Sequence, residues 1–277
     1  MRGSGELFRG ARVLAADLLD MLTGAACPGC GGRAPRGRAV CATCDAAIGR
    51  TGIALCLRCL REGMVGGAAP ADGGAGGSTD AGAGGCPRHG PDRLLLAGPR
   101  HEPPLDRVVR AYKYEGARAL DRWIATLLPE PPGDATFRRE AALVPVPLHP
   151  ARLAWRGFDQ ARLLAAAAGR RWGIPVVEGL RRVRDHAPQA RLGPDARRAN
   201  VCGAFAVRPE AAALLRDRPL LLVDDVATTG STLLEAADAL AIAAPAWILS
   251  LAAAHGGPPD ASEPSLHEAV AAPRRVW

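Results

Sequence analysis

The stretch 220–232, LLLVDDVATTGST, decides the fold of this chain because an apolar run, two acids and a hydroxyl-rich turn follow one another directly. A strand that is apolar throughout is typical of the centre of a parallel sheet, where both faces are covered. Asp224 and Asp225 come where the apolar run stops. Ligands of open α/β sheets bind beyond the carboxyl ends of the strands. We therefore expect a ligand site here.

The turn after the two acids has the composition of a phosphate-binding loop. Residues 231–244, STLLEAADALAIAA, predict a helix whose N-terminus would offer free N–H groups and a partial positive charge to a phosphate. The residues that would complete this cradle are Ala227, Thr228, Thr229, Gly230, Ser231 and Thr232. Carboxylates repel phosphate, so the two acids suit the vicinal hydroxyls of a ribose, or a bridging magnesium ion. The stretch therefore indicates a sugar phosphate.

Alternating strands and helices surround this stretch. Apolar runs predict further strands at 93–98, 141–147, 174–180 and 246–254, and apolar periodicity predicts helices at 105–112, 120–127 and 159–173. This βαβ rhythm is typical of an α/β fold with a doubly wound, mostly parallel sheet. We assign it to residues 93–256, followed by a proline-rich tail at 257–277.

The cysteines predict a small metal-binding domain over residues 25–92. Seven of the eight cysteines lie before residue 87, and six form pairs with two intervening residues. A fourth pair of the same spacing combines a cysteine with a histidine. Zinc takes four such ligands in a tetrahedron, so we expect two structural zinc ions without an open position. The sequential assignment uses Cys27, Cys30, Cys41 and Cys44 at one site, and Cys56, Cys59, Cys86 and His89 at the other.

Alternatives to this assignment stay open in the sequence. The two sites could be cross-braced, the cysteines could form redox pairs or disulfides, and His89 could be an ordinary exposed histidine. The two halves of the second site are separated by a flexible Gly/Ala-rich loop at 63–85, but closing a longer loop adds only a modest entropic cost.

The N-terminal residues and the lengths of the apolar runs predict a cytoplasmic protein. Residues 1–24 predict a short amphipathic helix rather than a signal peptide, because Asp17 and Asp20 interrupt the apolar part. No apolar run approaches the roughly 20 residues of a transmembrane helix. Because the cytoplasm is reducing, we do not expect the cysteines to form disulfides.

The charge distribution favours anionic partners. The formal net charge is +7, and residues 138–216 contain 15 arginines, no lysine and 6 acids. This stretch is either a solvated surface or a phosphate-binding face, since arginine matches phosphate oxygens geometrically. The chain has a single lysine, Lys113, which could offer a compact charge to a phosphate.

Residues 220–232 resemble the phosphoribosyl-pyrophosphate (PRPP) loop of type I phosphoribosyltransferases. More of the chain resembles one branch, the ComF family of competence-associated proteins with a double zinc ribbon. The motifs that carry this resemblance are the paired cysteines, YKYEG at 112–116, VPVPLHPARLAWRGFDQARLLA at 144–165, RVRDHAPQARLGPDARRANVCGAF at 182–205, and the PRPP-type loop.

The resemblance implies roles for particular residues. Asp224 and Asp225 would bind the ribose, and the turn from Ala227 to Thr232 would hold its 5′-phosphate. The loop that faces pyrophosphate would contain Val146, Pro147, Leu148 and His149, with Arg156 and Lys113 on the same side. A further signature contains Gln189, Arg197 and Asn200. The chain departs from the family pattern at Asp159, where asparagine is usual, at His186, where threonine is frequent, and at His89, where cysteine is usual.

The resemblance also implies a function. We expect a phosphoribosyltransferase-like protein that binds PRPP, or a related ribose 5-phosphate compound, with Mg²⁺ and is linked to DNA uptake in natural competence. Pentosyl transfer from PRPP is the activity implied, although no residue identifies an acceptor base. The alternative is a non-catalytic adaptor that binds single-stranded DNA through the zinc ribbons and the arginine-rich face and acts with other competence proteins.

Overall fold

The structure is a computed structural model that describes residues 25–62, 86, 89, 93–184 and 203–256. The helix expected at 1–24, the loop at 63–85, the tail at 257–277 and the signature residues 186, 189, 197 and 200 lie outside these residues. The chain divides into two compact units. The first contains residues up to Gly49 and Glu102–Leu120, and the second contains Arg50–His101 and the chain from Asp121 onward. We describe each unit by itself.

The first unit combines a cysteine-bearing turn with short helices. Its helices are α2 (Ala42–Ile48), α4 (Leu105–Tyr114) and the 3-10 helix η1 (Arg118–Leu120). Helix α4 follows the predicted apolar periodicity and buries Leu105, Val108, Val109 and Tyr112. The Arg107 guanidinium donates to the carbonyl of Gly29 at 3.2 Å, which ties α4 to the Cys27–Cys30 turn.

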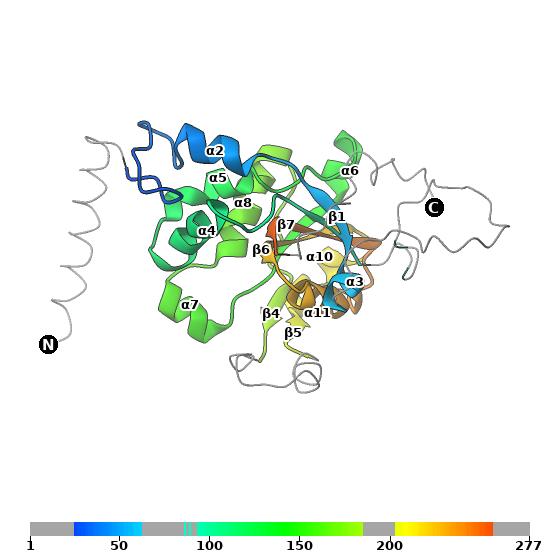
Figure 1. Cartoon of the computed structure of the whole chain (residues 1–277). Helices are drawn as coiled ribbons and strands as arrows, with labels where there is room; N and C mark the ends of the chain where they lie inside the picture. The colour runs from blue at the N-terminus through cyan, green and yellow to red at the C-terminus, as the bar shows by residue number, and fades with distance from the viewer. Residues whose placement is uncertain (1–24, 63–85, 87–88, 90–92, 185–202, 257–277) are drawn as a thin grey trace, which may run out of the picture. The chain divides into compact units, whose positions relative to one another are not determined.

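The second unit is built on a five-stranded sheet in the order β1-β2-β7-β6-β3. Figure 1 labels three of these strands, β1, β7 and β6. The strands are β1 (Ile53–Cys56), β2 (Leu94–Ala97), β7 (Trp247–His255), β6 (Pro219–Ala227) and β3 (Ala142–Pro145). Only β1 runs antiparallel to its neighbour; the pairs β2–β7, β7–β6 and β6–β3 are parallel. The predicted mostly parallel α/β sheet is therefore confirmed, with β6 next to its centre.

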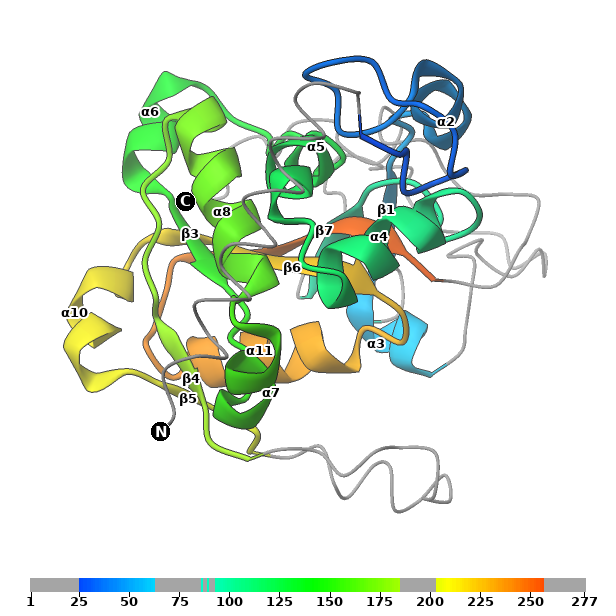
Figure 2. The same cartoon turned by 90° about the vertical axis from the view of Figure 1, so that its left-hand side faces the viewer.

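Helices cover both faces of this sheet (Figure 2). Helices α5 (Asp121–Ala125) and α8 (Gln160–Trp172) lie on one face, and α8 packs against β3 and β6. Helices α3 (Leu57–Arg61) and α11 (Ser231–Ala241) lie on the other, where Leu220 and Leu222 share a buried cluster with Leu233 and Leu234. The remaining helices of this unit are α6 (Ala135–Glu140), α7 (Pro150–Arg156), η3 (Pro209–Ala211) and α10 (Ala212–Leu215).

One predicted strand is wrong in its position. Residues 174–180 form only an isolated bridge, Val176 to Leu143, at the outer edge of β3, and the strand begins at Leu180. Pro175 has no N–H to donate to a ladder, which limits regular pairing. The observed strand β4 (Leu180–Arg182) pairs antiparallel with β5 (Phe205–Val207) in a separate two-stranded sheet. Among the helices described here, none has the length and apolar character that crossing a membrane requires.

Candidate metal centres and ligand site

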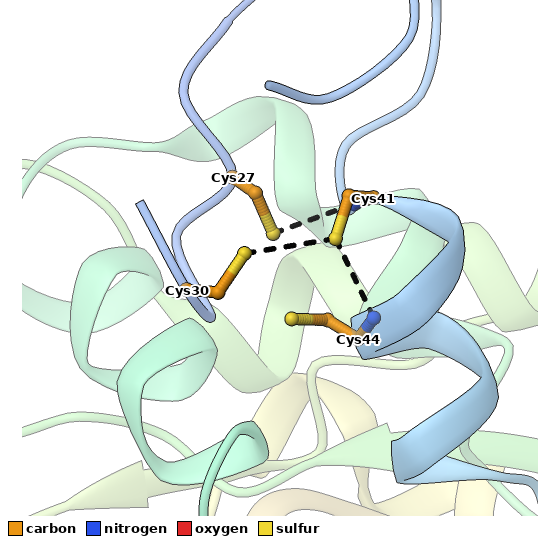
Figure 3. A group of neighbouring side chains, drawn as sticks. All are labelled: Cys27, Cys30, Cys41 and Cys44. Carbon is orange, nitrogen blue, oxygen red and sulfur yellow. Dashed lines mark hydrogen bonds between the residues drawn. The ribbon is translucent and has the colours of Figure 1, made fainter. Parts of the chain in front are cut away.

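The first group of metal-ligating residues lies in the first unit (Figure 3). The sulfur atoms of Cys27, Cys30, Cys41 and Cys44 all lie within 4.8 Å of one another. Cys41 is the N-cap of α2, and its sulfur accepts the N–H of Cys44 at 3.4 Å, so the helix start sets the spacing of this pair. Gly29 lies in the turn between Cys27 and Cys30. A Cβ at this position would lie only 3.0 Å from the Cys44 sulfur, so the close approach favours glycine.

The protonation of these thiols follows their surroundings. Burial disfavours ionisation of Cys27, but backbone N–H donors from Cys41, Cys30 and Gly29 outweigh it and lower the pKa to about 7. Burial, together with neighbouring sulfur groups, raises the pKa of the Cys44 thiol above its usual value. A metal ion binds the thiolate form, so binding at this group would release protons.

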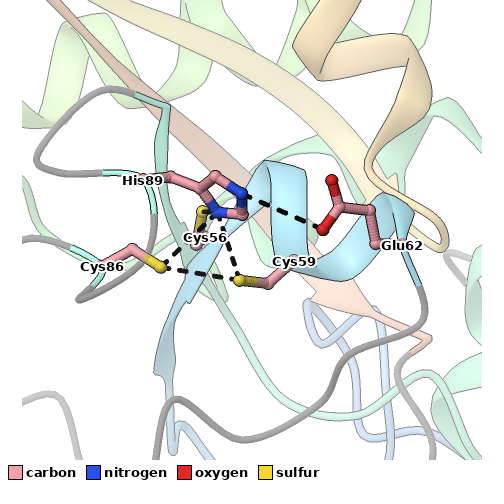
Figure 4. Close-up of polar contacts among 5 residues, drawn as sticks. All are labelled: Cys56, Cys59, Glu62, Cys86 and His89. Atoms are coloured by element: carbon pink, nitrogen blue, oxygen red, sulfur yellow. Dashed lines mark hydrogen bonds and ion pairs between the residues drawn. The ribbon is translucent and has the colours of Figure 1, made fainter. Parts of the chain in front are cut away.

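The second group lies in the second unit and combines Cys56, Cys59, Cys86 and His89 (Figure 4). The Nδ1 atom of His89 is 3.5 Å from the sulfur of Cys56, 3.5 Å from that of Cys59 and 3.7 Å from that of Cys86. Burial, followed by the adjacent sulfur groups, raises the pKa of the Cys59 thiol to about 12. His89 therefore faces the three sulfur atoms.

The spacing of the ligand atoms fits zinc. A tetrahedral ion with Zn–S of about 2.3 Å and Zn–N of about 2.0 Å places two sulfurs about 3.8 Å apart and a nitrogen and a sulfur about 3.5 Å apart. The sulfurs of Cys30 and Cys41 are 3.7 Å apart, and those of Cys59 and Cys86 are 3.5 Å apart. The first four ligands along the chain make up one group and the last four make up the other, which excludes the cross-braced alternative for these eight residues.

Glu62 lies beside the second group, next to His89, and was not predicted from the sequence. Its Oε2 lies 3.9 Å from Nε2 of His89, on the side of the ring away from the sulfurs (Figure 4). A histidine that binds a metal through one nitrogen commonly donates its other N–H to a carboxylate, which fixes the ring and its tautomer. The only signal in the sequence is an acid three residues after Cys59.

The two aspartates lie inside the last part of β6 rather than after it. The strand continues to Ala227, and Asp224 pairs with Ala252 of β7. Side chains alternate along a strand, so Asp224 shares the face of Leu220 and Leu222, which α11 covers, and Asp225 takes the opposite face. Asp225 is 8% exposed. The carboxylates therefore leave β6 on opposite faces.

Asp225 lies near a third acid, Asp159. Burial raises the pKa of Asp159, the hydrogen bonds from Leu148 N and Arg162 N oppose this, and the charges of Asp225 and Glu178 raise it further. Asp159 is the N-cap of α8, and its two oxygens accept the N–H of Leu148 at 2.9 Å and that of Arg162 at 3.0 Å. Carboxylates that share a partly buried space repel each other, and a divalent cation with oxygen ligands would relieve that repulsion.

The hydroxyl-rich turn connects β6 to α11. Residues 228–230 form a bend, with Thr228 and Thr229 exposed, and α11 begins at Ser231. The Thr229 hydroxyl donates to that of Ser231 at 3.0 Å. Gly230 precedes α11 with φ +67°, a left-handed conformation that favours glycine. Ala227 and Thr232 flank this turn, so the expected cradle residues form one continuous segment at the end of the strand.

The loop expected to face pyrophosphate follows the neighbouring strand β3. Val146 donates its N–H to the carbonyl of Val223 at 2.9 Å, so the loop starts beside the end of β6. Pro147 and Leu148 follow, and His149 caps α7 by accepting the N–H of Ala151. The Arg156 guanidinium donates to Gln160 at 3.0 Å. Lys113 lies on α4 in the other unit.

Two further titratable side chains, one buried and one partly buried, were given no role from the sequence. His255, at the end of β7, is 1% exposed and pairs with Ala227. Glu235 lies on α11, where burial raises its pKa to about 7 although the charges of Arg182 and Arg61 oppose this. A single histidine at the end of a strand and a single glutamate in a helix match no motif, so the sequence does not identify either residue.

Comparison with known proteins gives one curated relative. Competence protein F of Haemophilus influenzae is 33% identical to this chain over 153 residues. The alignment covers 52% of this chain and 64% of that protein, so it spans less than two thirds of the relative's length. No family model matches the chain. This relative, together with the two groups of metal ligands on an α/β fold, confirms the predicted resemblance to the ComF family.

Proposed function

We propose that this chain binds PRPP, or a related ribose 5-phosphate compound, with Mg²⁺ at the carboxyl ends of β3 and β6, in a role linked to DNA uptake. The observation that carries the proposal is the position of Asp225, an 8% exposed acid at the end of a central parallel strand, three residues before the hydroxyl-rich turn of α11. That combination supplies acceptors for hydroxyl groups next to donors for a phosphate.

The neighbouring loop supports the same placement. Strands β3 and β6 are parallel, with Pro145 opposite Val223, so residues 146–149 and 228–230 leave the same edge of the sheet. The exposed hydroxyls of Thr228 and Thr229 and the N-terminus of α11 suit the 5′-phosphate. The carboxylates of Asp159 and Asp225 provide the hard oxygen ligands that Mg²⁺ prefers. Mg²⁺ would neutralise part of the pyrophosphate charge.

Pentosyl transfer is the activity that this site would support. The bond between C1 of the ribose and the pyrophosphate oxygen breaks, pyrophosphate leaves, and a nitrogen nucleophile forms the new bond to C1 and releases its proton. The described residues offer positioning and charge for this step.

The decisive experiment is calorimetry of the purified protein with Mg-PRPP. We expect binding by the wild type and none by the double variant Asp224→Asn, Asp225→Asn, because the uncharged amides replace the acceptors of the ribose hydroxyls. The matched control is Asp217→Asn at the opposite end of β6, where the residue is exposed and has φ 56°, a conformation that asparagine tolerates. If the wild type does not bind, or if the double variant unfolds, the proposal is wrong.

A second candidate function, single-stranded DNA binding, is favoured by a basic pocket on α5 and α8. Arg122, Arg170 and Arg171 line it, together with Ala125, Thr126 and Ala167. Trp155 of α7 is 71% exposed and offers a face on which a base could stack. Phosphate contacts make such binding weaken steeply with salt. Fluorescence anisotropy with an oligonucleotide at several salt concentrations should show a smaller salt slope for Arg170→Ala, Arg171→Ala; an unchanged slope would contradict this function.

A further inference from the structure

The turn at residues 228–230, called the phosphate turn below, contacts helix α3, which contains one ligand of the second metal group. A Cβ added to Gly230 would lie 3.0 Å from Cδ2 of Leu57, 3.1 Å from Cδ2 of Leu60 and 3.4 Å from the carbonyl oxygen of Leu57. Leu57 is 0% exposed and Leu60 is 7% exposed. Both are on α3, which packs against α11 (Figure 1). Leu57 and Leu60 therefore pack against Gly230 of the turn, and these two side chains are called the leucine floor below.

Helix α3 is too short to be stable in isolation, so its conformation depends on contacts with the rest of the unit. It has five residues, and isolated helices shorter than about 12 residues are marginal in water. Its N-cap, Cys56, makes no side-chain capping hydrogen bond, and Cys59 lies within the helix. Both cysteines belong to the second metal group, so an ion bound there would join α3 to Cys86 and His89. One ligand, Cys59, therefore lies in the same short helix as Leu57 and Leu60, and a second, Cys56, caps that helix.

Arg93 connects α3 and α11 through hydrogen bonds. Its carbonyl oxygen accepts the N–H of Leu57 at 3.0 Å, and its guanidinium donates to Asp238 of α11 at 2.9 Å and 2.8 Å. Arg93 has φ 73°, a left-handed backbone conformation that is uncommon for a residue other than glycine. The contact adds a polar link between the two helices, beside the contacts of Leu57 and Leu60 with Gly230.

We propose that Leu57 and Leu60 are positioning residues for the phosphate turn, and that a metal ion in the second group holds them against Gly230. The inference rests on the proposed function, because it assigns the second metal group to the same ligand site. Loss of that ion frees α3, removes the floor under Gly230 and lets the start of α11 open. The turn then offers its N–H groups to a phosphate less often, and the apparent affinity falls in proportion.

Two readouts test this inference. The N–H of Leu234 donates to the carbonyl of Gly230 at 2.9 Å, so hydrogen exchange of this amide reports the opening of the turn without any ligand. We expect Cys59→Ser to lower the zinc content by one ion per chain and to accelerate this exchange. Leu60→Ala, which keeps all four ligands, should accelerate it about tenfold, and Mg-PRPP affinity should fall by a similar factor, which corresponds to about 1.4 kcal/mol.

Two further variants separate positioning from general stability. Leu60→Met conserves the side-chain volume and should restore the wild-type exchange rate and affinity. Leu127→Ala removes another buried leucine of this unit that does not contact Gly230, so it should lower global stability without a selective change at Leu234. Wild-type exchange at Leu234 in both Cys59→Ser and Leu60→Ala would overturn the inference. If the wild type binds no PRPP, the proposed function fails, and the exchange measurements still decide the coupling.

Discussion

Removal of the Asp159 carboxylate by Asp159→Ala tests how the edge of the sheet is held together. Asp159 joins two elements at once, because one oxygen accepts Arg162 N at the start of α8 and the other accepts Leu148 N in the loop after β3. Alanine cannot accept either bond. We expect a less stable protein whose loop at residues 146–149 opens more often.

The magnitude follows from three contributions. Loss of an N-cap costs about 1 kcal/mol. The N–H of Leu148 loses a charged acceptor, which costs about 1–2 kcal/mol in a partly buried position. Burial and the charge of Asp225 raise the pKa of the Asp159 carboxyl, so removal of this carboxylate offsets part of that loss. The net destabilisation is about 1–2 kcal/mol, or roughly 2–8 °C in melting temperature for a chain of this size.

Urea unfolding followed by circular dichroism measures the stability, and hydrogen exchange of the Leu148 amide measures the loop. The matched control is Asp134→Ala at the N-cap of α6, which also accepts two backbone N–H groups, from Thr136 and Phe137. Those hydrogen bonds lower the pKa of Asp134, so its carboxylate stabilises the fold above its ordinary pKa, and this contribution is lost in acid. The control should leave Leu148 exchange unchanged.

One outcome would contradict the anchoring role of Asp159. If Asp159→Ala is as stable as the wild type and its Leu148 amide exchanges at the wild-type rate, then the carboxylate does not anchor the loop. The hydrogen bonds would then be fully offset by repulsion from Asp225, and the description of this edge would be wrong.

Three other predictions concern metal content, pH and packing. Elemental analysis of the purified protein should find two zinc ions per chain, and one ion would contradict one of the two groups. Burial raises the pKa of Glu235 from its ordinary 4.5 to about 7, so ionisation of this carboxyl costs stability as pH rises from 4.5 through 7. Glu235→Gln should therefore stabilise the protein more at pH 8 than at pH 6, by up to about 1 kcal/mol after allowance for partial exposure. An equal gain in thermal unfolding at both pH values would refute this. Gly98→Ala should destabilise the protein by about 3 kcal/mol or more, because its Cβ would collide with the carbonyl oxygens of Ala253 and Leu127, and wild-type stability in chemical denaturation would show that the backbone yields there.

The candidate site was only partly predictable from sequence. The acids, the turn and the loop after β3 were located because each comes at or just after the end of an apolar run. The proximity of Asp159 to Asp225 was not, because it depends on how the N-terminus of α8 is placed against the end of β6. His255 and Glu62 were missed for a similar reason: each acquires its environment from a segment distant in the chain.

The sequence by itself determined the features that are local: the apolar strand β6, the helical periodicity of α4, α8 and α11, and the two-residue spacing of the metal ligands. Each depends on neighbours within a few residues, so the chain pattern carries it. Only the tertiary structure decided that the metal groups are sequential, that β1 joins the main sheet, that the two aspartates leave β6 on opposite faces, and that α3 lies under Gly230. These are contacts between segments far apart in sequence, and they are set by how apolar faces pack, which no local pattern records.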